Sequence, residues 1–408
     1  MMLKNAVVGQ SGGPTCAINA TLAGVIDSLL KSKKIDKVYG MINGIDGILN
    51  ENLKELNKIF SDKDNLSLLK LTPSSYLGSC RVKLPEENED KKMYEKIFST
   101  LEKFNIEYFF YIGGNDSMDT VMKLNNFAKS HNKKLTVIGV PKTIDNDLWG
   151  TDHCPGFASA AKYVATSIAE IARDAYCYDI ESVTIVEIMG RNAGWLAASS
   201  ALARSNNQSA PDLIYLPEHP FEIENFYKDI EEKFKTKKNL IIAVSEGIKD
   251  SNGLYIAASN QIYKNDKFGH MKLGGAAKNL ENAVKIKFGC KCRSVELNVL
   301  QRCASHFLSK TDISESFKIG KTAVSYAFKG VSGEMMIFKR EKSDEYKMSI
   351  SSMDINLIAN KEKQMPKNFI NANGNDVTKA FINYARPLIL GEEKILTKDG
   401  IPVHISLK

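Results

Sequence analysis

Runs of apolar, β-branched and aromatic residues recur along the chain, and glycine or polar residues follow each of them. The runs lie at residues 6–8, 108–112, 135–140, 183–188, 213–216 and 240–244. Continuous apolar runs of this kind are typical of parallel strands that are buried on both faces. Between the runs, apolar residues recur at helical spacing, for example at 118–127 and 221–234. The alternation predicts layered α/β domains, whose ligands bind beyond the carboxyl ends of the strands.

The composition is that of a soluble globular protein. Hydrophobic residues make up 43% and charged residues 25% of 408, a length that is enough for two domains with a core each. No apolar run approaches the roughly 20 residues of a membrane helix, so we expect no membrane-spanning segment. Seven cysteines without framework spacing indicate reduced thiols. These features favour a cytoplasmic protein.

The formal net charge of +7 bears on the binding partners. A basic excess suits nucleic acid, an anionic surface or small polyphosphate ligands. The lysine-rich stretches at 31–37, 133–134 and 235–238 have no interleaved aromatic residues, which favours a solvated face. Nucleic acid is therefore not an expected partner.

Two glycine-rich segments each follow a predicted strand and lead into a predicted helix. Residues 9–19 read Gly-Gln-Ser-Gly-Gly-Pro-Thr-Cys-Ala-Ile-Asn, and residues 113–117 read Gly-Gly-Asn-Asp-Ser. Backbone amides at such helix starts can hold phosphate, and Asn115 with Asp116 could face a metal-bound phosphate. Tight turns and helix caps are equally compatible with both segments. The first segment matches neither G-x-x-x-x-G-K-[ST] nor G-x-G-x-x-G, which disfavours nucleotide binders of those two types.

The segment Pro-Lys-Thr-Ile-Asp-Asn-Asp at residues 141–147 carries the strongest chemical signal, directly after an apolar run. Phosphoryl transfer to an alcohol needs a base for the hydroxyl proton, cations for the phosphoryl oxygens and a magnesium ion. Asp145, Lys142 and Asp147 can fill these roles. The alternative reading is an exposed turn with a solvated lysine.

Polar residues also follow the runs 183–188 and 240–244. Arg191 ends a Met-Gly-Arg sequence, where its guanidinium could bind phosphate in a forked geometry. Glu246 follows the later run. The alternative reading makes Met189 a core residue and Arg191 the surface partner of a carboxylate.

Taken in order, these segments resemble the phosphofructokinase family over about residues 5–302. The most specific part is Thr-Ile-Asp-Asn-Asp followed later by Met-Gly-Arg. The resemblance implies two Rossmann-like three-layer α/β domains with the active site in the cleft between them. Residues 1–155 and about 303–361 would form the phosphoryl-donor domain, and residues 156–302 and about 362–408 the fructose 6-phosphate domain. A homo-oligomer, dimer or tetramer, and Mg²⁺ as cofactor are also implied.

The resemblance further implies roles for individual residues. Asp145 would deprotonate the 1-hydroxyl of fructose 6-phosphate. The substrates would be bound by Gly13, Arg81, Thr143, Ile144, Asp147, Met189, Gly190, Arg191, Glu246, Arg293 and Arg302, with Gly13 and Arg81 on the donor side. Mg²⁺ would be held by Asn115, where the family carries aspartate, and by Asp116. Ser182 stands where many members present an arginine across a subunit boundary, so substrate binding shared between subunits stays open.

Two positions favour pyrophosphate over ATP as the donor. ATP-dependent members carry glycine where this chain has Asp116, whose carboxylate would clash with and repel the α-phosphate of a nucleotide. They also usually carry glycine in place of Lys142, whose charge could stabilise the departing phosphate. The implied reaction, which we expect to be reversible, converts pyrophosphate and fructose 6-phosphate to phosphate and fructose 1,6-bisphosphate. An ATP-dependent enzyme is the first alternative; a sugar-phosphate sensor without catalysis is the second, and the intact Asp145 argues against it.

Overall fold

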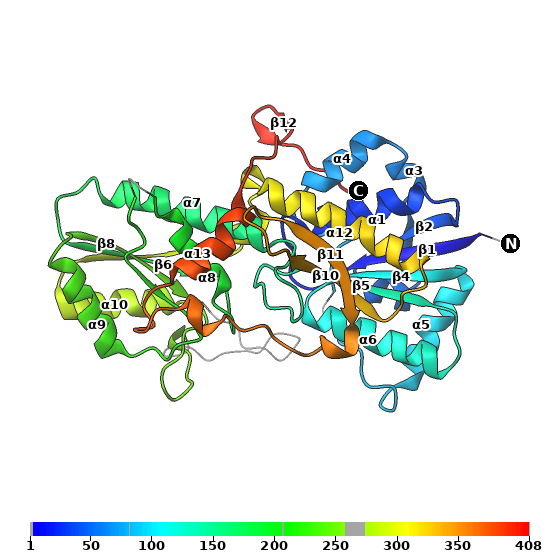
Figure 1. Ribbon diagram of the computed structural model, residues 1–408, viewed down its shortest axis with the longest axis horizontal. Helices are drawn as coiled ribbons and strands as arrows, with labels where there is room; N and C mark the ends of the chain where they lie inside the picture. The colour runs from blue at the N-terminus through cyan, green and yellow to red at the C-terminus, as the bar shows by residue number, and fades with distance from the viewer. Residues whose placement is uncertain (1–2, 81, 206–207, 258–273, 408) are drawn as a thin grey trace.

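The chain forms two α/β units that lie side by side, each around its own β-sheet (Figure 1). The computed structural model describes residues 3–80, 82–205, 208–257 and 274–407. A two-stranded hairpin of β12 (Thr397–Lys398) and β13 (Ile401–Pro402) belongs to neither sheet. The predicted fold class, α/β with two layered domains, is confirmed. None of the helices in the described ranges is long and apolar enough to cross a membrane.

The first unit is built on a seven-stranded sheet in the order β11-β10-β5-β4-β1-β2-β3. The inner strands run parallel to one another, and the two edge strands run antiparallel to their neighbours. The loops after β1, β4 and β5 therefore meet at one edge of the sheet. The strands are β1 (Lys4–Gln10), β2 (Ile35–Met41), β3 (Leu53–Glu55), β4 (Ile106–Gly113), β5 (Thr136–Pro141), β10 (Glu334–Arg340) and β11 (Met348–Asp354).

Helices cover both faces of this sheet and give the unit three layers (Figure 1). α1 (Ile18–Leu30) and α12 (Lys310–Phe328) share one core cluster, and α5 (Lys91–Lys103) and α6 (Asn115–Ser130) share the cluster on the opposite face. α1 and α12 touch backbone to backbone, because a Cβ on Gly24 would lie 2.1 Å from a carbonyl oxygen of α12. Glycine is therefore required at this crossing.

The second unit has a four-stranded, fully parallel sheet in the order β7-β8-β6-β9. One face is covered by α7, α8 and α13, and the other by α9 and α10. The strands are β6 (Ser182–Ile188), β7 (Leu213–Tyr215), β8 (Asn239–Ser245) and β9 (Lys291–Glu296). The helices are α7 (Phe157–Ala175), α8 (Trp195–Ala198), α9 (Ile223–Phe234), α10 (Ala276–Phe288) and α13 (Lys379–Ala385).

The chain crosses between the units several times. After the second sheet is complete, α12, β10 and β11 return to the first unit, and α13 then packs in the core of the second. The remaining short elements are α2 (Ile45–Leu49), α3 (Asn57–Phe60), α4 (Lys63–Leu71), α11 (Leu300–Cys303), η1 (Ser199–Ala203), η3 (Ser305–Phe307), η4 (Ile355–Leu357), η5 (Lys367–Phe369) and η6 (Arg386–Ile389).

The last residues of the chain depart from the expectation that the tail, about residues 362–408, packs on the second unit. The Ile405 N–H donates to Thr72 Oγ1 at 3.1 Å, so the end of the chain lies on the first unit. Ile405 and Leu407 are partly buried against the core that α1 and α12 form there. Burial of these two apolar side chains explains why the end of the chain packs on the first unit.

Candidate active site

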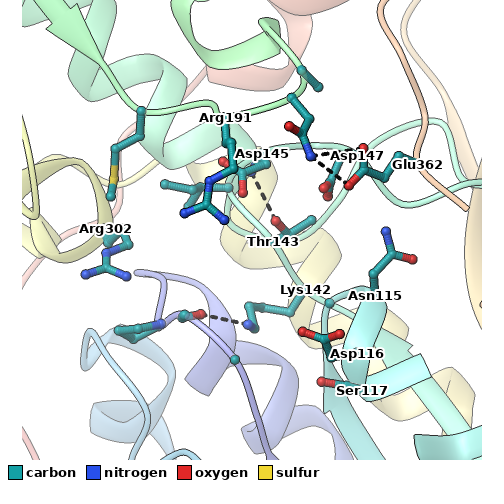
Figure 2. Close-up of a pocket in the computed structure, with 18 of the residues that line it drawn as sticks. Asn115, Asp116, Ser117, Lys142, Thr143, Asp145, Asp147, Arg191, Arg302 and Glu362 are labelled. Carbon is teal, nitrogen blue, oxygen red and sulfur yellow. Dashed lines mark hydrogen bonds between the residues drawn. The ribbon is translucent and has the colours of Figure 1, made fainter. Parts of the chain in front are cut away.

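A cavity of about 670 Å³ lies where the loops after five parallel strands meet, three from the first sheet and two from the second (Figure 2). This is the position at which α/β sheets bind ligands. Its lining residues are Gly12, Gly13, Pro14, Gly114, Asn115, Asp116, Ser117, Lys142, Thr143, Ile144, Asp145, Asp147, Met189, Arg191, Asn192, Ala193, Glu246, Arg302, Asn360 and Glu362.

The loop after β5 carries two of the three aspartates that line the cavity, Asp145 and Asp147. Asn146, which separates them, adopts a left-handed backbone conformation with φ of 56° and is fully buried. Its side-chain amide donates to Tyr384 Oη at 2.9 Å, and its oxygen accepts from the Cys154 N–H at 2.9 Å. The Asp145 N–H donates to Thr143 Oγ1 at 3.1 Å. These contacts present both Asp145 and Asp147 to the cavity.

Burial raises the pKa of three carboxyl groups of the cavity. It raises the pKa of Asp145 to about 6, and the nearby negative charge of Glu246 adds to the effect. Burial likewise raises the pKa of Asp147 to about 7, with contributions from Asp145 and Glu362. The pKa of Glu246 rises to about 6, again through burial. A carboxyl group with a pKa near 6 is still ionised at neutral pH and is a stronger base than an exposed aspartate.

Lys142 is buried rather than solvated, with 2% of its surface exposed. Its ammonium group donates to the Gly13 carbonyl at 2.7 Å, which ties the β5 loop to the β1 loop. Burial lowers the pKa of Lys142 to about 8; Asp145 and Asp147 counteract this, and Arg302 adds to it. The interpretation of this residue as a surface lysine is therefore wrong.

The first turn of α6 forms the wall that the sequence assigned to metal-bound phosphate. Gly114 occupies the N-cap position, so Asn115 and Asp116 lie inside the helix and are not its caps. The Asn115 Oδ1 atom is buried and has no hydrogen-bond partner among the described residues. In the same part of the chain, no group of three or more His, Cys, Asp and Glu side chains is placed to hold a metal ion. The wall thus fits a hard cation that takes most of its ligands from substrate oxygens and water.

The loop after β6 forms the opposite wall together with β8 and α11. The Gly190 N–H donates to Glu246 Oε1 at 3.3 Å, and the Met189 N–H donates to Gln301 Oε1 at 3.1 Å. A Cβ on Gly247 would lie 1.9 Å from the Arg191 carbonyl oxygen, so the two loops touch through their backbones. Arg302 reaches across toward the β1 loop, and its Nε is buried without a partner in the described ranges. The cavity thereby brings three charged side chains toward Asp145: Arg191 and Arg302, which Figure 2 labels, and Glu246.

Two of the predicted substrate ligands in the described ranges, Gly190 and Arg293, are not among the residues that line this cavity, although Gly190 lies between the lining residues Met189 and Arg191. Arg293 lies on β9, the edge strand of the second sheet, where its exposed side chain is 3.4 Å from Asp174. Within one chain, Arg293 does not reach the site, because β9 at the edge of the second sheet holds it away from the strand ends that line the cavity. Arg81 lies outside the described residues.

Sequence reasoning missed several residues of the site. Asn192 directly follows the Met-Gly-Arg sequence, and this position next to Arg191 could have marked it as a site residue. Asn146 stands between the two predicted aspartates, and its buried role was signalled only by the left-handed preference of asparagine. Asn360 and Glu362 come from an irregular segment after η4, and no strand or glycine motif precedes them to mark a ligand site.

A carboxylate between guanidinium and ammonium groups, at the joint edge of two parallel sheets, is an arrangement suited to phosphoryl transfer. The chain belongs to the phosphofructokinase family, which its sequence matches over residues 5–296. It is 40% identical over 407 residues to the pyrophosphate–fructose 6-phosphate 1-phosphotransferase of Xanthomonas campestris pv. campestris, covering 99% of this chain and 96% of that protein. The protein of the same name from Methylococcus capsulatus is 37% identical over 410 residues, covering 100% and 96% of the two chains.

A solved structure extends the similarity to three dimensions. The pyrophosphate-dependent phosphofructokinase of Nitrosospira multiformis is 36% identical and superimposes with a TM-score of 0.90. The match covers 99% of this chain and 96% of that one. The similarity therefore includes both units and the C-terminal segments that cross between them.

Proposed function

We propose that the chain transfers a phosphoryl group from pyrophosphate to the 1-hydroxyl of fructose 6-phosphate, giving fructose 1,6-bisphosphate and phosphate, and that the reaction is reversible. The observation that carries the proposal is the buried Lys142, whose ammonium group stands at the donor side of the cavity beside the glycine loop. The names of the full-length relatives point to the same reaction.

Fructose 6-phosphate would occupy the side of the cavity formed by the second unit. Arg191 and Arg302 would bind its phosphate, and Glu246 would accept hydrogen bonds from sugar hydroxyls. Met189 packs on the apolar core beneath and would present a flat contact to the sugar. Thr143 and Ile144 would line the path between sugar and donor, with the 1-hydroxyl within reach of Asp145.

Pyrophosphate would lie between the β1 loop and the first turn of α6. Backbone amides around Gly13 and at the start of α6 favour anions, and Lys142 would neutralise the phosphate that departs. Asp116 would occupy the space that the α-phosphate of a nucleotide requires, and its charge would repel that phosphate.

Mg²⁺, when bound, would supply positive charge that offsets the charge of the pyrophosphate oxygens. Asn115 Oδ1 and the Asp116 carboxylate are the residues that would hold it, and the unpartnered Asn115 oxygen supports this assignment. A neutral amide in place of a carboxylate predicts weak affinity for the ion in the absence of pyrophosphate.

The chemical step then needs one proton transfer and one exchange of bonds. Asp145 accepts the proton of the 1-hydroxyl while the hydroxyl oxygen bonds to the terminal phosphorus of pyrophosphate. The bridging P–O bond breaks at the same time, and phosphate leaves beside Lys142. In the reverse direction, protonated Asp145 returns the proton to the sugar oxygen.

The test supplies purified protein and magnesium with fructose 6-phosphate and either pyrophosphate or ATP, and follows fructose 1,6-bisphosphate. We expect product with pyrophosphate and none with ATP. Product with ATP alone would refute the assigned role of Asp116. The double variant Asp116→Gly, Lys142→Gly should lose pyrophosphate turnover, and unchanged turnover would remove the basis of the donor assignment.

A further inference from the structure

A short segment at residues 360–363, which we call the crossing segment, contacts three parts of the site at once. Asn360 donates to Asp119 Oδ1 of α6 at 2.9 Å. The Lys363 N–H donates to the Asp147 carbonyl at 2.6 Å, and Glu362 forms a β-bridge with Leu148. The crossing segment is therefore fixed to the donor wall and to the loop that carries both aspartates.

Glu362 extends these contacts to the second unit. The Asn192 side-chain amide donates to both carboxylate oxygens of Glu362, at 3.1 and 3.3 Å (Figure 2). Both side chains line the cavity. Asn192 follows Arg191 in the loop after β6, so this contact links the loop assigned to the sugar phosphate with the loop that carries Asp145.

A carboxylate in a cavity for two anionic substrates is not a phosphate ligand, because like charges repel. The amide donor of Asn192, by contrast, matches it as a charge-assisted hydrogen-bond partner. The two sides of the β6 loop are then held differently. Gly190 and Arg191 rest on the β8 loop, through the Glu246 side chain and the close backbone approach of Gly247, whereas Asn192 is held from the first unit.

We propose that Glu362 is a positioning residue, which acts through Asn192 to hold the β6 loop and its Arg191 against the catalytic loop. The proposal rests on the proposed function, in which Arg191 binds the phosphate of fructose 6-phosphate. The donor residues are anchored independently of this contact, since Lys142 is held by the Gly13 carbonyl and Asp116 by α6. Loss of the contact should therefore weaken the binding of the sugar phosphate and leave the binding of pyrophosphate unchanged.

The test measures KM for each substrate and kcat in Glu362→Ala and Asn192→Ala, with Lys361→Ala as a control from the same segment whose side chain does not line the cavity. We expect the KM for fructose 6-phosphate to rise about fivefold to tenfold in both variants, the size of one charge-assisted hydrogen bond. The KM for pyrophosphate and the unfolding temperature should stay as in the control. An equal rise of both KM values, or none, would overturn the proposal.

A double variant that exchanges the amide and the carboxylate between positions 192 and 362, which we call the reversed pair, distinguishes a positioning role from a general disturbance of the local structure. Asn192→Asp alone places two carboxylates face to face and should raise the KM for fructose 6-phosphate above that of Asn192→Ala. Adding Glu362→Gln restores one amide donor and one carboxylate acceptor in exchanged places, and the KM should return to within about twofold of the original value. A reversed pair that is no better than Asn192→Asp would refute the contact as the cause.

Calorimetric titration of the same variants with fructose 6-phosphate keeps this test independent of the assigned reaction. If the unaltered protein forms no product from pyrophosphate, the proposed function fails, and the titration still decides whether Glu362 positions the sugar-phosphate loop. Equal affinity in all variants would overturn the positioning role even where the enzyme is active.

Discussion

The active site is assembled from two kinds of chain segment that differ in how they reach it. The loops after β1, β4, β5, β6 and β8 arrive because parallel strands end at a common edge, and they bring Lys142, Asp145 and Arg191. The C-terminal segments arrive by crossing between the units, and they bring Glu362 and Tyr384. Tyr384 contacts Asn146 across 238 residues of sequence.

The two kinds of segment also carry different chemistry. The strand-end loops supply Asp145 and Lys142, whose pKa values burial shifts toward neutrality, and Arg191, which would bind phosphate. The C-terminal segments supply hydrogen bonds that hold those loops: Lys363 donates to the Thr151 and Asp152 carbonyls, and Tyr384 donates to the Asp152 carbonyl. The comparison suggests that reactivity comes from the first kind of segment and geometry from the second.

The largest effect is expected from removing the proposed base, Asp145, which belongs to a strand-end loop. Asp145→Asn keeps the shape of the side chain and removes the proton acceptor, so kcat should fall by about a thousandfold. Calorimetry should still detect fructose 6-phosphate binding, because the guanidinium groups of Arg191 and Arg302 are untouched. A variant that keeps a tenth of its activity would show that another group takes the proton.

The second test removes the buried ammonium group of the β5 loop. Lys142→Met fills a similar volume without charge, and pyrophosphate-dependent kcat should fall by about a hundredfold because the departing phosphate loses its cation. The unfolding temperature is measured alongside, since Lys142 also bonds to the Gly13 carbonyl. Full activity in Lys142→Met would assign the donor preference to Asp116 alone.

The same division explains what sequence reasoning could predict. Asp145, Lys142 and Arg191 each follow an apolar run, and the rule that ligands bind at the carboxyl ends of parallel strands places them together. That rule says nothing about Glu362, which follows the irregular stretch after η4. It also does not detect β9 or β11, whose exposed and half-buried residues lack the continuous apolar pattern of an inner strand. Within one chain, Arg293 lies away from the cavity because β9 is the edge strand, and its role as a substrate ligand stays a prediction.

The pH dependence should reflect groups of the strand-end loops. Asp145 must be ionised to act as a base, so kcat/KM should fall as the pH drops through about 6, the pKa to which burial raises this group. Lys142 must be protonated, so the rate should fall again as the pH rises through about 8, its lowered pKa. Each limb should approach about a tenfold change per pH unit.

Lys142→Arg identifies the basic limb of that profile. An arginine stays charged well above pH 8, so whatever activity the variant retains should lose the alkaline decline and keep the acid limb. An unchanged alkaline limb in Lys142→Arg would assign it to another group.

The smallest effect should come from the C-terminal segments, where loss of a hydrogen bond loosens a loop but removes no reactive group. Tyr384→Phe removes a hydroxyl that accepts from Asn146 at 2.9 Å and donates to the Asp152 carbonyl at 2.8 Å. We expect kcat to fall about fivefold as the aspartates lose their fixed geometry. Tyr215→Phe is the matched control, because Tyr215 lies on β7 of the second sheet and its hydroxyl donates to Asp229 of α9, away from the catalytic loop. Each variant should lose about 1 kcal/mol of unfolding free energy per hydrogen bond, two bonds in Tyr384→Phe and one in Tyr215→Phe, and only Tyr384→Phe should lose activity. Equal kcat values in the two variants would show that the strand-end loops hold their own geometry and that the C-terminal segments serve stability alone.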